Sequence, residues 1–74
     1  MVRSIQNYTA ESQAEADAWF AALDEDLLAF QAGTLTPSWV DELMTDPMVV
    51  TMQHTTTAGP PPYIYCRTEI SIPD

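Results

Sequence analysis

The chain has 74 residues and carries 11 acidic side chains, two arginines and no lysine, for a formal net charge of -9. So short a chain buries a modest core, and we expect one domain over residues 1–74. One cysteine and one histidine exclude an internal disulfide and a tetrahedral zinc site. No apolar run approaches the roughly 20 residues of a membrane span. A lone thiol and the lack of a signal-peptide pattern predict a cytoplasmic protein.

Residues 2–8 can add an edge strand to a sheet made by later residues, and a long amphipathic helix is predicted after them. Ser12 and Glu15 have the spacing of a capping box, with Thr9 as a second candidate cap. Gly33 is placed to end the helix. Six apolar residues fall within about 100° of arc and form the buried stripe. They are Ala16, Trp19, Phe20, Leu23, Leu27 and Phe30.

A second, shorter helix is predicted over residues 36–46. Thr36 can cap it, and Pro37 suits its first position. Asp46 precedes Pro47, and a residue before proline avoids the helical region, so the helix is expected to end there.

The hydrophobic period then changes from 3.6 to 2, which predicts a β-hairpin of residues 48–57 and 63–72 around the loop AGPPP. With residue 57 opposite residue 63, one face is more apolar than the other. That face has Met48, Val50, Met52, His54 and Thr56 against Ile72, Ile70, Thr68, Cys66 and Ile64. An isolated hairpin is barely stable, so it must pack on the helices. We predict an α+β fold: two helices on a C-terminal antiparallel hairpin, which the N-terminal segment can extend to three strands.

The loop sequence Pro60-Pro61-Pro62-Tyr63 also matches P-P-x-Y, the pattern that WW domains bind. WW domains require an exposed, extended polyproline helix. Because Tyr63 is predicted to enter a strand directly after a short loop, we favour a stiff hairpin tip over a recruitment motif.

Catalytic and metal sites find little support. His54 and Cys66 lie opposite each other in the predicted register, and such a pair can form a thiolate nucleophile. The sequence shows no third orienting group, so packing within a half-buried sheet is the favoured interpretation. The consecutive acids Asp24, Glu25 and Asp26 point about 100° apart on a helix and cannot converge on one ion. Neither an EF-hand nor a phosphate-binding glycine loop is present. We therefore predict no enzyme activity, catalytic residue, metal or cofactor.

Tyr63, Tyr65 and Arg67 on the other hairpin face resemble a stacking platform for single-stranded nucleic acid. The net charge argues against direct nucleic-acid binding, because such binding needs basic side chains near phosphate. Cross-strand aromatic packing and a protein-binding patch are the alternatives.

The acidic residues are concentrated on one segment: residues 9–46 carry nine acids and no base. A solvated helix face normally mixes both signs. One hypothesis is a decoy that presents carboxylates to the basic nucleic-acid site of a protein or ribonucleoprotein. In general character, though not by any motif, the chain resembles small acidic inhibitors of restriction, CRISPR or transcription machinery carried by phages or mobile elements. The predicted partner-binding residues are Glu15, Asp17, Asp24, Glu25, Asp26, Asp41 and Glu42, with Tyr63 and Tyr65.

Two other accounts compete with the decoy. A non-catalytic adaptor, antitoxin-like or assembly protein would make its contacts through the aromatic sheet face, and acidity would confer solubility. A halophilic or lysine-poor proteome would acidify the whole chain, yet residues 47–74 are nearly neutral. An exposed sheet edge also allows a homodimer.

Overall fold

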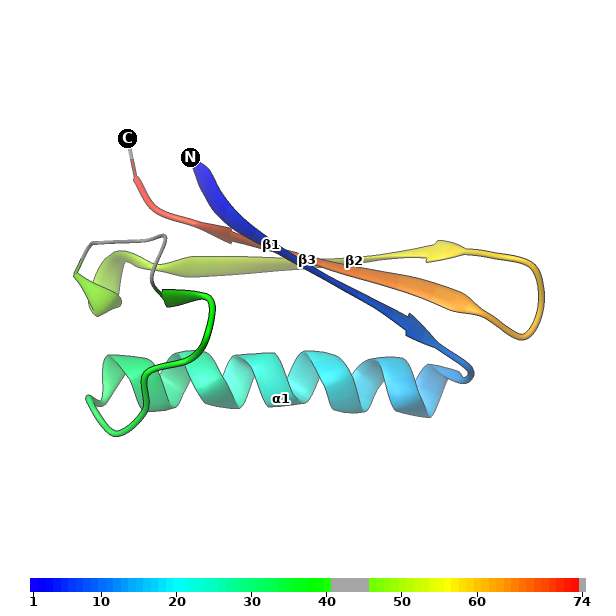
Figure 1. The fold of residues 1–74 in the computed structure, drawn as a ribbon, viewed down its shortest axis with the longest axis horizontal. Coiled ribbons are helices and arrows are strands. Elements are labelled where there is room, and N and C mark those ends of the chain that lie inside the picture. Colours follow the sequence, from blue (N-terminus) through cyan, green and yellow to red (C-terminus); the bar gives the residue numbers. More distant parts are fainter. Residues whose placement is uncertain (41–45, 74) are drawn as a thin grey trace.

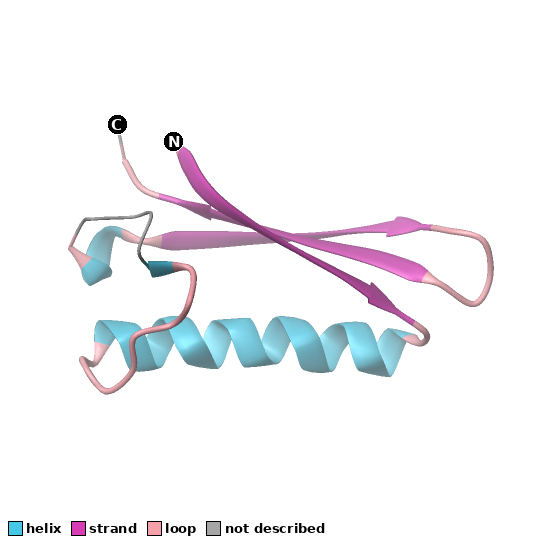
Figure 2. Cartoon of the chain, viewed as in Figure 1, coloured by secondary structure: helices cyan, strands magenta, loops and turns pink. Residues whose placement is uncertain are grey.

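The computed structural model describes residues 1–40 and 46–73. It is an α+β fold, in which one α-helix lies on one face of a three-stranded antiparallel sheet with strand order β1-β3-β2 (Figures 1 and 2). None of the helices in the described part of the chain combines the length and apolarity needed to cross a bilayer. The elements are β1 (Val2–Ala10), α1 (Gln13–Gln31), the 3-10 turn η2 (Pro47–Val49), β2 (Thr51–Ala58) and β3 (Ile64–Ser71).

The expected N-terminal edge strand is confirmed, and it extends to Ala10. β1 pairs with β3, so the second strand of the hairpin becomes the centre of the sheet. The register of β1 shifts between Val2 and Ser4, which marks a bulge near its start. Beyond β3, Ile72 N–H donates to the Met1 carbonyl oxygen at 2.9 Å, so the two chain ends lie side by side (Figure 1).

Both predicted ends of the long helix are confirmed. Glu15 N–H donates to Ser12 Oγ at 3.1 Å, which satisfies one of the free amides of the first turn. At the other end, Gly33 has a φ of +79°, a left-handed conformation that suits glycine. The N–H of Thr34 then donates to the Ala29 carbonyl at 2.9 Å and closes the helix end.

The second helix is wrong where its residues are described. Residues 37–40 make a tight turn, in which Val40 N–H donates to the Pro37 carbonyl at 3.1 Å and Val40 has a 3-10 conformation. The Trp39 side chain is buried against Phe30, with the ring centroids 5.7 Å apart, so tertiary packing overrides the local helix signal here. Residues 41–45 lie outside the described residues. Asp46 then caps η2 through its side chain.

The hairpin has the predicted five-residue loop, displaced by one residue to residues 59–63. Ala58 therefore lies opposite Ile64, and residue 57 does not face residue 63. The reason is a turn in which Tyr63 N–H donates to the Pro60 carbonyl at 2.9 Å and Gly59 N–H donates to the Tyr63 carbonyl at 3.2 Å. Each cross-strand partner moves by two residues, which keeps the predicted division of β2 and β3 between the two faces. Residues 48–50 precede the strand, and η2 ends at Val49.

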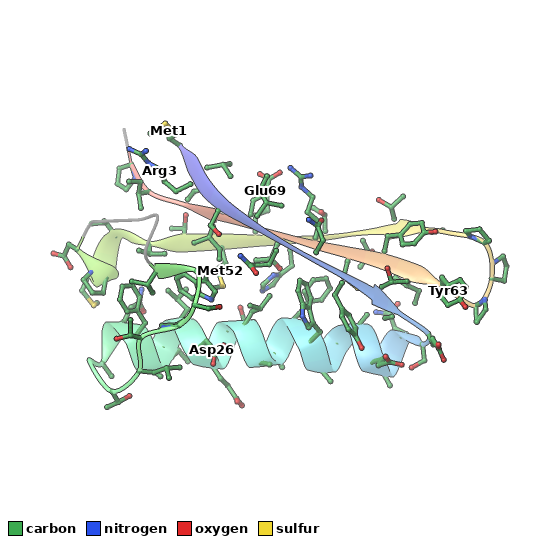
Figure 3. All side chains as sticks on the ribbon, in the orientation of Figure 1. Met1, Arg3, Asp26, Met52, Tyr63 and Glu69 are labelled. Carbon is green, nitrogen blue, oxygen red and sulfur yellow. The ribbon has the colours of Figure 1, made fainter. Side chains whose placement is uncertain are left out.

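The core lies between α1 and the inner face of the sheet, where Met52 points in Figure 3. Leu23, Trp39, Val50, Ile70 and Ile72 form one buried cluster. A second cluster consists of Ala10, Ala16 and Cys66. Trp19 packs against both clusters and joins them into one layer. The opposite face of the sheet is covered by no described element.

Candidate interaction surfaces

His54 connects the sheet to the helix on the β2 side. Its Nε2 lies 2.7 Å from Asp24 Oδ1, and its Nδ1 lies 2.6 Å from Thr68 Oγ1. The ring also stacks on Phe20 with centroids 4.6 Å apart. A carboxylate only accepts hydrogen bonds, so Nε2–H donates to Asp24, and Nδ1 of a neutral ring accepts from the Thr68 hydroxyl. The chain of contacts supplies the buried Thr68 hydroxyl with a partner.

Tyr8 makes the corresponding connection on the β1 side. Its hydroxyl donates to Glu15 Oε1 at 2.6 Å, and its ring stacks on Trp19 with centroids 5.5 Å apart. The hydrogen bond to the Glu15 carboxylate, followed by desolvation, raises the pKa of Tyr8. One aromatic pair and one carboxylate therefore fix each flank of α1 to an edge strand.

The predicted pairing of His54 with Cys66 is wrong. His54 lies opposite Thr68, and Cys66 lies opposite Thr56 on β2 and Tyr8 on β1. The thiol donates a weak hydrogen bond to the Ile64 carbonyl at 3.8 Å, and burial raises its pKa. A raised thiol pKa is the opposite of what a thiolate nucleophile needs, so the packing interpretation fits Cys66.

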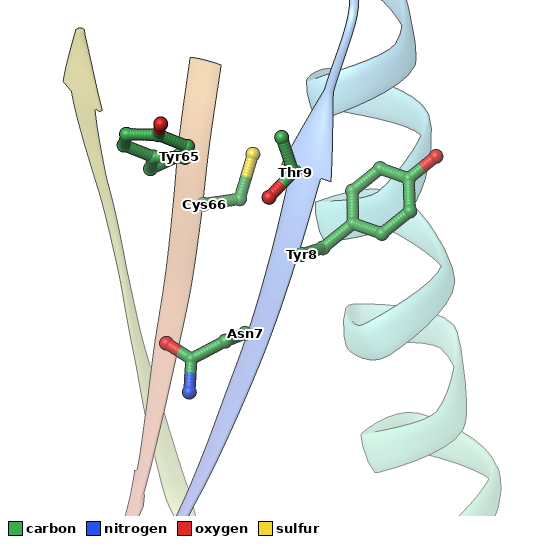
Figure 4. A pocket seen from close by; sticks show the side chains of 5 residues that line it. All are labelled: Asn7, Tyr8, Thr9, Tyr65 and Cys66. Carbon is green, nitrogen blue, oxygen red and sulfur yellow. The ribbon is translucent and has the colours of Figure 1, made fainter. Parts of the chain in front are cut away.

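Cys66 also contributes to a shallow depression of about 530 Å³ between β1 and β3 (Figure 4). Tyr8 lies beside α1, and Tyr65 lies on the other side of β3 in this view. Asn7 and Thr9 complete the lining. None of the five lining residues is charged, and within residues 1–40 and 46–73 no group of three His, Cys, Asp or Glu side chains could hold a metal ion.

The predicted carboxylates of α1 form two rows instead of one acidic face. Asp17 and Asp24 are two helical turns apart and lie on the flank toward β2, where Asp24 meets His54. Glu15 and Asp26 are three turns apart on the flank toward β1, where Glu15 meets Tyr8. Glu25 projects away from the core stripe. Asp41 and Glu42 lie outside the described residues.

Small apolar residues occupy the outward crest of α1 between the two rows. Leu28 on this crest is 66% exposed. Only Glu25 brings charge to the crest, so the negative potential comes mainly from its margins. Four exposed alanines lie on the same crest: Ala14, Ala18, Ala21 and Ala22.

The outer face of the sheet differs from α1 because it carries an exposed aromatic residue and both signs of charge. Tyr65 is 45% exposed, and Arg67 Nη2 pairs with Glu69 Oε1 at 3.3 Å. Figure 3 shows Glu69 and Arg3 on the side of the sheet away from α1. Tyr63 is 42% exposed but belongs to the loop, not to a strand. The Pro60–Tyr63 hydrogen bond folds the P-P-x-Y sequence into a turn, not into the extended helix that a WW domain binds.

Two contacts were not foreseen from the sequence: His54 with Asp24, and Tyr8 with Glu15. The first joins residues 30 positions apart, and no local spacing indicates it. The second had a signal, because Tyr8 is a polar aromatic residue near the end of the strand that leads directly into the helix cap.

Comparison with protein families, curated proteins and solved structures gives no match for this chain. Its function must be inferred from the chemistry of these surfaces.

Proposed function

We propose that the protein is a small acidic inhibitor that occludes the nucleic-acid site of a basic protein or ribonucleoprotein. The observation that supports the proposal is the separation of charge between two layers. Seven of the eight acids in the described residues lie on α1 or on the segments beside it: Glu11, Glu15, Asp17, Asp24, Glu25, Asp26 and Asp46. Arg3 and Arg67 lie on strands, and the eighth acid, Glu69, pairs with Arg67 there.

Two parallel rows of carboxylates can stand in for the phosphates that a basic groove binds. Such a field attracts a basic surface over a distance of roughly one Debye length, about 10 Å at 0.1 M salt. Each exposed ion pair contributes only about 0–1 kcal/mol, so the effect must be collective. Inhibitors of restriction or CRISPR complexes, carried by phages into the host cytoplasm, are the biological class that fits this chemistry. No membrane, cofactor or direct contact with nucleic acid is part of the proposal.

The residues that test the proposal differ from those that hold the fold. Glu15 and Asp24 bond to Tyr8 and His54, so their removal would confuse binding with folding. Glu25 and Asp26 are free of that double role in the contacts described above. Asp17, Asp41 and Glu42 remain part of the proposed binding set.

The experiment is capture of proteins from a cell lysate on the immobilised chain, at about 50 mM and about 500 mM salt, where the Debye length differs about threefold. We expect basic nucleic-acid-binding proteins to be retained at low salt and lost at high salt. Each captured protein is then mixed with labelled nucleic acid, which the added chain should displace. Retention unchanged by salt, or nucleic acid that stays bound, would contradict the proposal.

A second candidate function uses the outer sheet face, and the exposure of Tyr65 and Tyr63 favours it. In this adaptor, antitoxin-like or assembly role, an aromatic patch carries the binding energy. Tyr65→Ala should then abolish capture, while Glu25→Gln with Asp26→Asn should only slow association. Under the inhibitor proposal the order of these two effects is reversed.

A further inference from the structure

The two edges of the sheet are protected to different degrees. Exposed strand edges pair with other chains unless bulges, charges or prolines block them. β1 has a bulge between Val2 and Ser4, and it carries Arg3. β2 has neither protection: its eight residues contain no Asp, Glu, Lys, Arg or Pro, and it stays in unbroken register with β3 from Thr51 to Ala58. In the described part of the chain β2 pairs with β3 alone.

The main-chain groups on the free edge of β2 can be assigned to particular residues. Gly59 N–H donates to the Tyr63 carbonyl, so this pair is hydrogen-bonded. Antiparallel pairs alternate between hydrogen-bonded and non-hydrogen-bonded, and residues of the second kind direct N–H and C=O outward. The hydrogen bond from Ile72 to Met1 agrees with this assignment. Odd-numbered residues of β3 direct their main-chain groups toward β2, so even-numbered residues such as Ile72 direct theirs toward the N-terminal strand. The outward groups therefore belong to Met52, His54, Thr56 and Ala58.

The space between sheet and helix is also open on this side. Ala10 of β1 and Ala58 of β2 both lie opposite Ile64, which makes them matched positions on the two edges. Ala10 is fully buried, whereas Ala58 and its inward-facing neighbour Thr56 are exposed. Phe20, which stacks on His54 of β2, is only half-buried.

Acidic groups line the rim of this gap. Asp24 reaches β2 through His54, and Asp17 lies two turns earlier on the same flank of α1, about 10 Å away along the helix. Both carboxylates are exposed. Alternate residues of an added strand would be about 7 Å apart on the helix-facing side. Two lysine or arginine side chains on that side can therefore reach the two carboxylates.

We propose that the free edge of β2 binds an extended basic segment of the partner protein as a fourth, antiparallel strand. Main-chain hydrogen bonds to the outward groups of β2 hold the segment, and its inward Lys or Arg side chains pair with Asp17 and Asp24. The inference rests on the proposed function for the basic character of the partner. It adds the binding mode: strand addition beside α1.

A second copy of this chain fits the edge less well. Two paired β2 edges would place both helices on the same face of one six-stranded sheet. The Asp17 and Asp24 rows of the two copies would then face each other, and like charges disfavour that arrangement. Charge complementarity therefore selects a basic strand.

The test uses a synthetic peptide of alternating lysine and threonine with the eight-residue length of β2. In an antiparallel addition the inward lysines are the residues whose N–H groups face β2. In one control peptide the main-chain nitrogen of every lysine is methylated, which removes the N–H donors that face β2 and keeps the side-chain charge. In the other control the main-chain nitrogen of every threonine is methylated, which leaves the lysine N–H donors intact. We expect the first control to bind at least about tenfold more weakly than the second, from the loss of several hydrogen bonds.

Amide hydrogen exchange locates the bound peptide. Protection should increase at Met52, His54, Thr56 and Ala58 with the unmodified peptide. Asp17→Asn should weaken binding about threefold, from one lost ion pair, whereas Glu69→Gln, the same charge change on the outer face, should leave it unchanged.

Equal binding of the two methylated peptides would overturn strand addition, even if that binding is salt-sensitive and leaves the acidic-inhibitor proposal intact. Protection of the β2 amides without peptide, rising with protein concentration, would assign the edge to a second copy and also overturn the inference. The two proposals can also fail separately. If the peptide binds by strand addition but the chain displaces nucleic acid from no captured protein, this inference stands and the proposed function is wrong.

Discussion

Each flank of α1 is joined to an edge strand by an aromatic stack and a hydrogen bond to a carboxylate, but the two flanks differ in how far they bury the residues between helix and sheet. On the β1 side Tyr8 stacks on Trp19 and bonds to Glu15, and on the β2 side His54 stacks on Phe20 and bonds to Asp24. Small residues close the space between α1 and the end of β1, with Ala10 and Ala16 fully buried. The β2 side is held by a polar bridge, in which His54 contacts both Asp24 and Thr68. Thr56 and Ala58, farther along β2, stay exposed. A hydrogen bond between helix and strand therefore does not by itself exclude water, because Thr56 and Ala58 on the β2 side stay exposed.

The largest expected effect comes from the matched alanines opposite Ile64. Ala10→Leu forces extra volume into a closed site and should destabilise the fold by about 2–3 kcal/mol. Ala58→Leu adds the same atoms to an open site and should change the free energy of unfolding by no more than about 0.5 kcal/mol. Urea unfolding of both variants measures the difference. Similar losses at the two positions would mean that the β2 side is as closed as the β1 side.

The polar bridge on the β2 side predicts the next effect. His54→Ala removes the partner of the fully buried Thr68 hydroxyl together with the stack on Phe20. A buried group left without its hydrogen bond costs about 1–3 kcal/mol, so we expect a loss of about 2 kcal/mol in urea unfolding. The double variant His54→Ala with Thr68→Val should recover part of it, because the unsatisfied hydroxyl is gone. No recovery would show that the hydroxyl is satisfied in another way.

Alkaline pH should weaken the β1 side first. The pKa of the Cys66 thiol is raised above 9.0 by burial, and that of Tyr8 is raised above 10.0 chiefly by its bond to Glu15. A raised folded pKa means that the unfolded chain loses its proton first. These groups contribute fully below the unfolded pKa, and their contribution is lost as pH rises through the folded one. The urea midpoint should therefore fall above about pH 9, less steeply in Cys66→Ala. An unchanged slope in that variant would remove Cys66 from the account.

The smallest expected effect is the loss of one hydroxyl on the β1 side. Tyr8→Phe keeps the stack on Trp19 and removes only the bond to Glu15. Because that bond is exposed to water, the loss in stability should be clearly smaller than for His54→Ala. Thermal unfolding of both variants under one condition gives the ranking. An equal or larger loss for Tyr8→Phe would invert the comparison between the flanks.

The sequence predicted those parts of the fold whose signals are local. Ser12 and Gly33 fixed the ends of α1, and the alternation in β2 and β3 gave the correct faces even though the pairing moved by two residues. It failed where packing at a distance decides. Trp39 is drawn into the core against Phe30, which replaces a helical start with a turn. Tyr63 is held in the loop by Pro60, and that displaces the register.

The candidate surface was foreseen in composition but not in geometry. Counting acids along residues 9–46 identifies a negative segment, and the 3.6-residue period places its charges off the core stripe. The count cannot show that Glu15 and Asp24 are engaged with Tyr8 and His54. It also cannot show that one edge of the sheet is open, because closure depends on residues from three separate segments meeting at Ile64.

The central claim is that the helical side, and not the sheet face, meets a basic partner. Its most direct test compares two variants that raise the net charge equally, by two. Glu25→Gln with Asp26→Asn removes carboxylates from α1, and Ile5→Lys with Thr9→Lys adds bases to the outer sheet face. Binding of a captured basic protein to each is measured at low salt. We predict about fivefold weaker binding for the first variant and unchanged binding for the second. Equal weakening of both would show that net charge alone, without a defined acidic surface, accounts for the interaction.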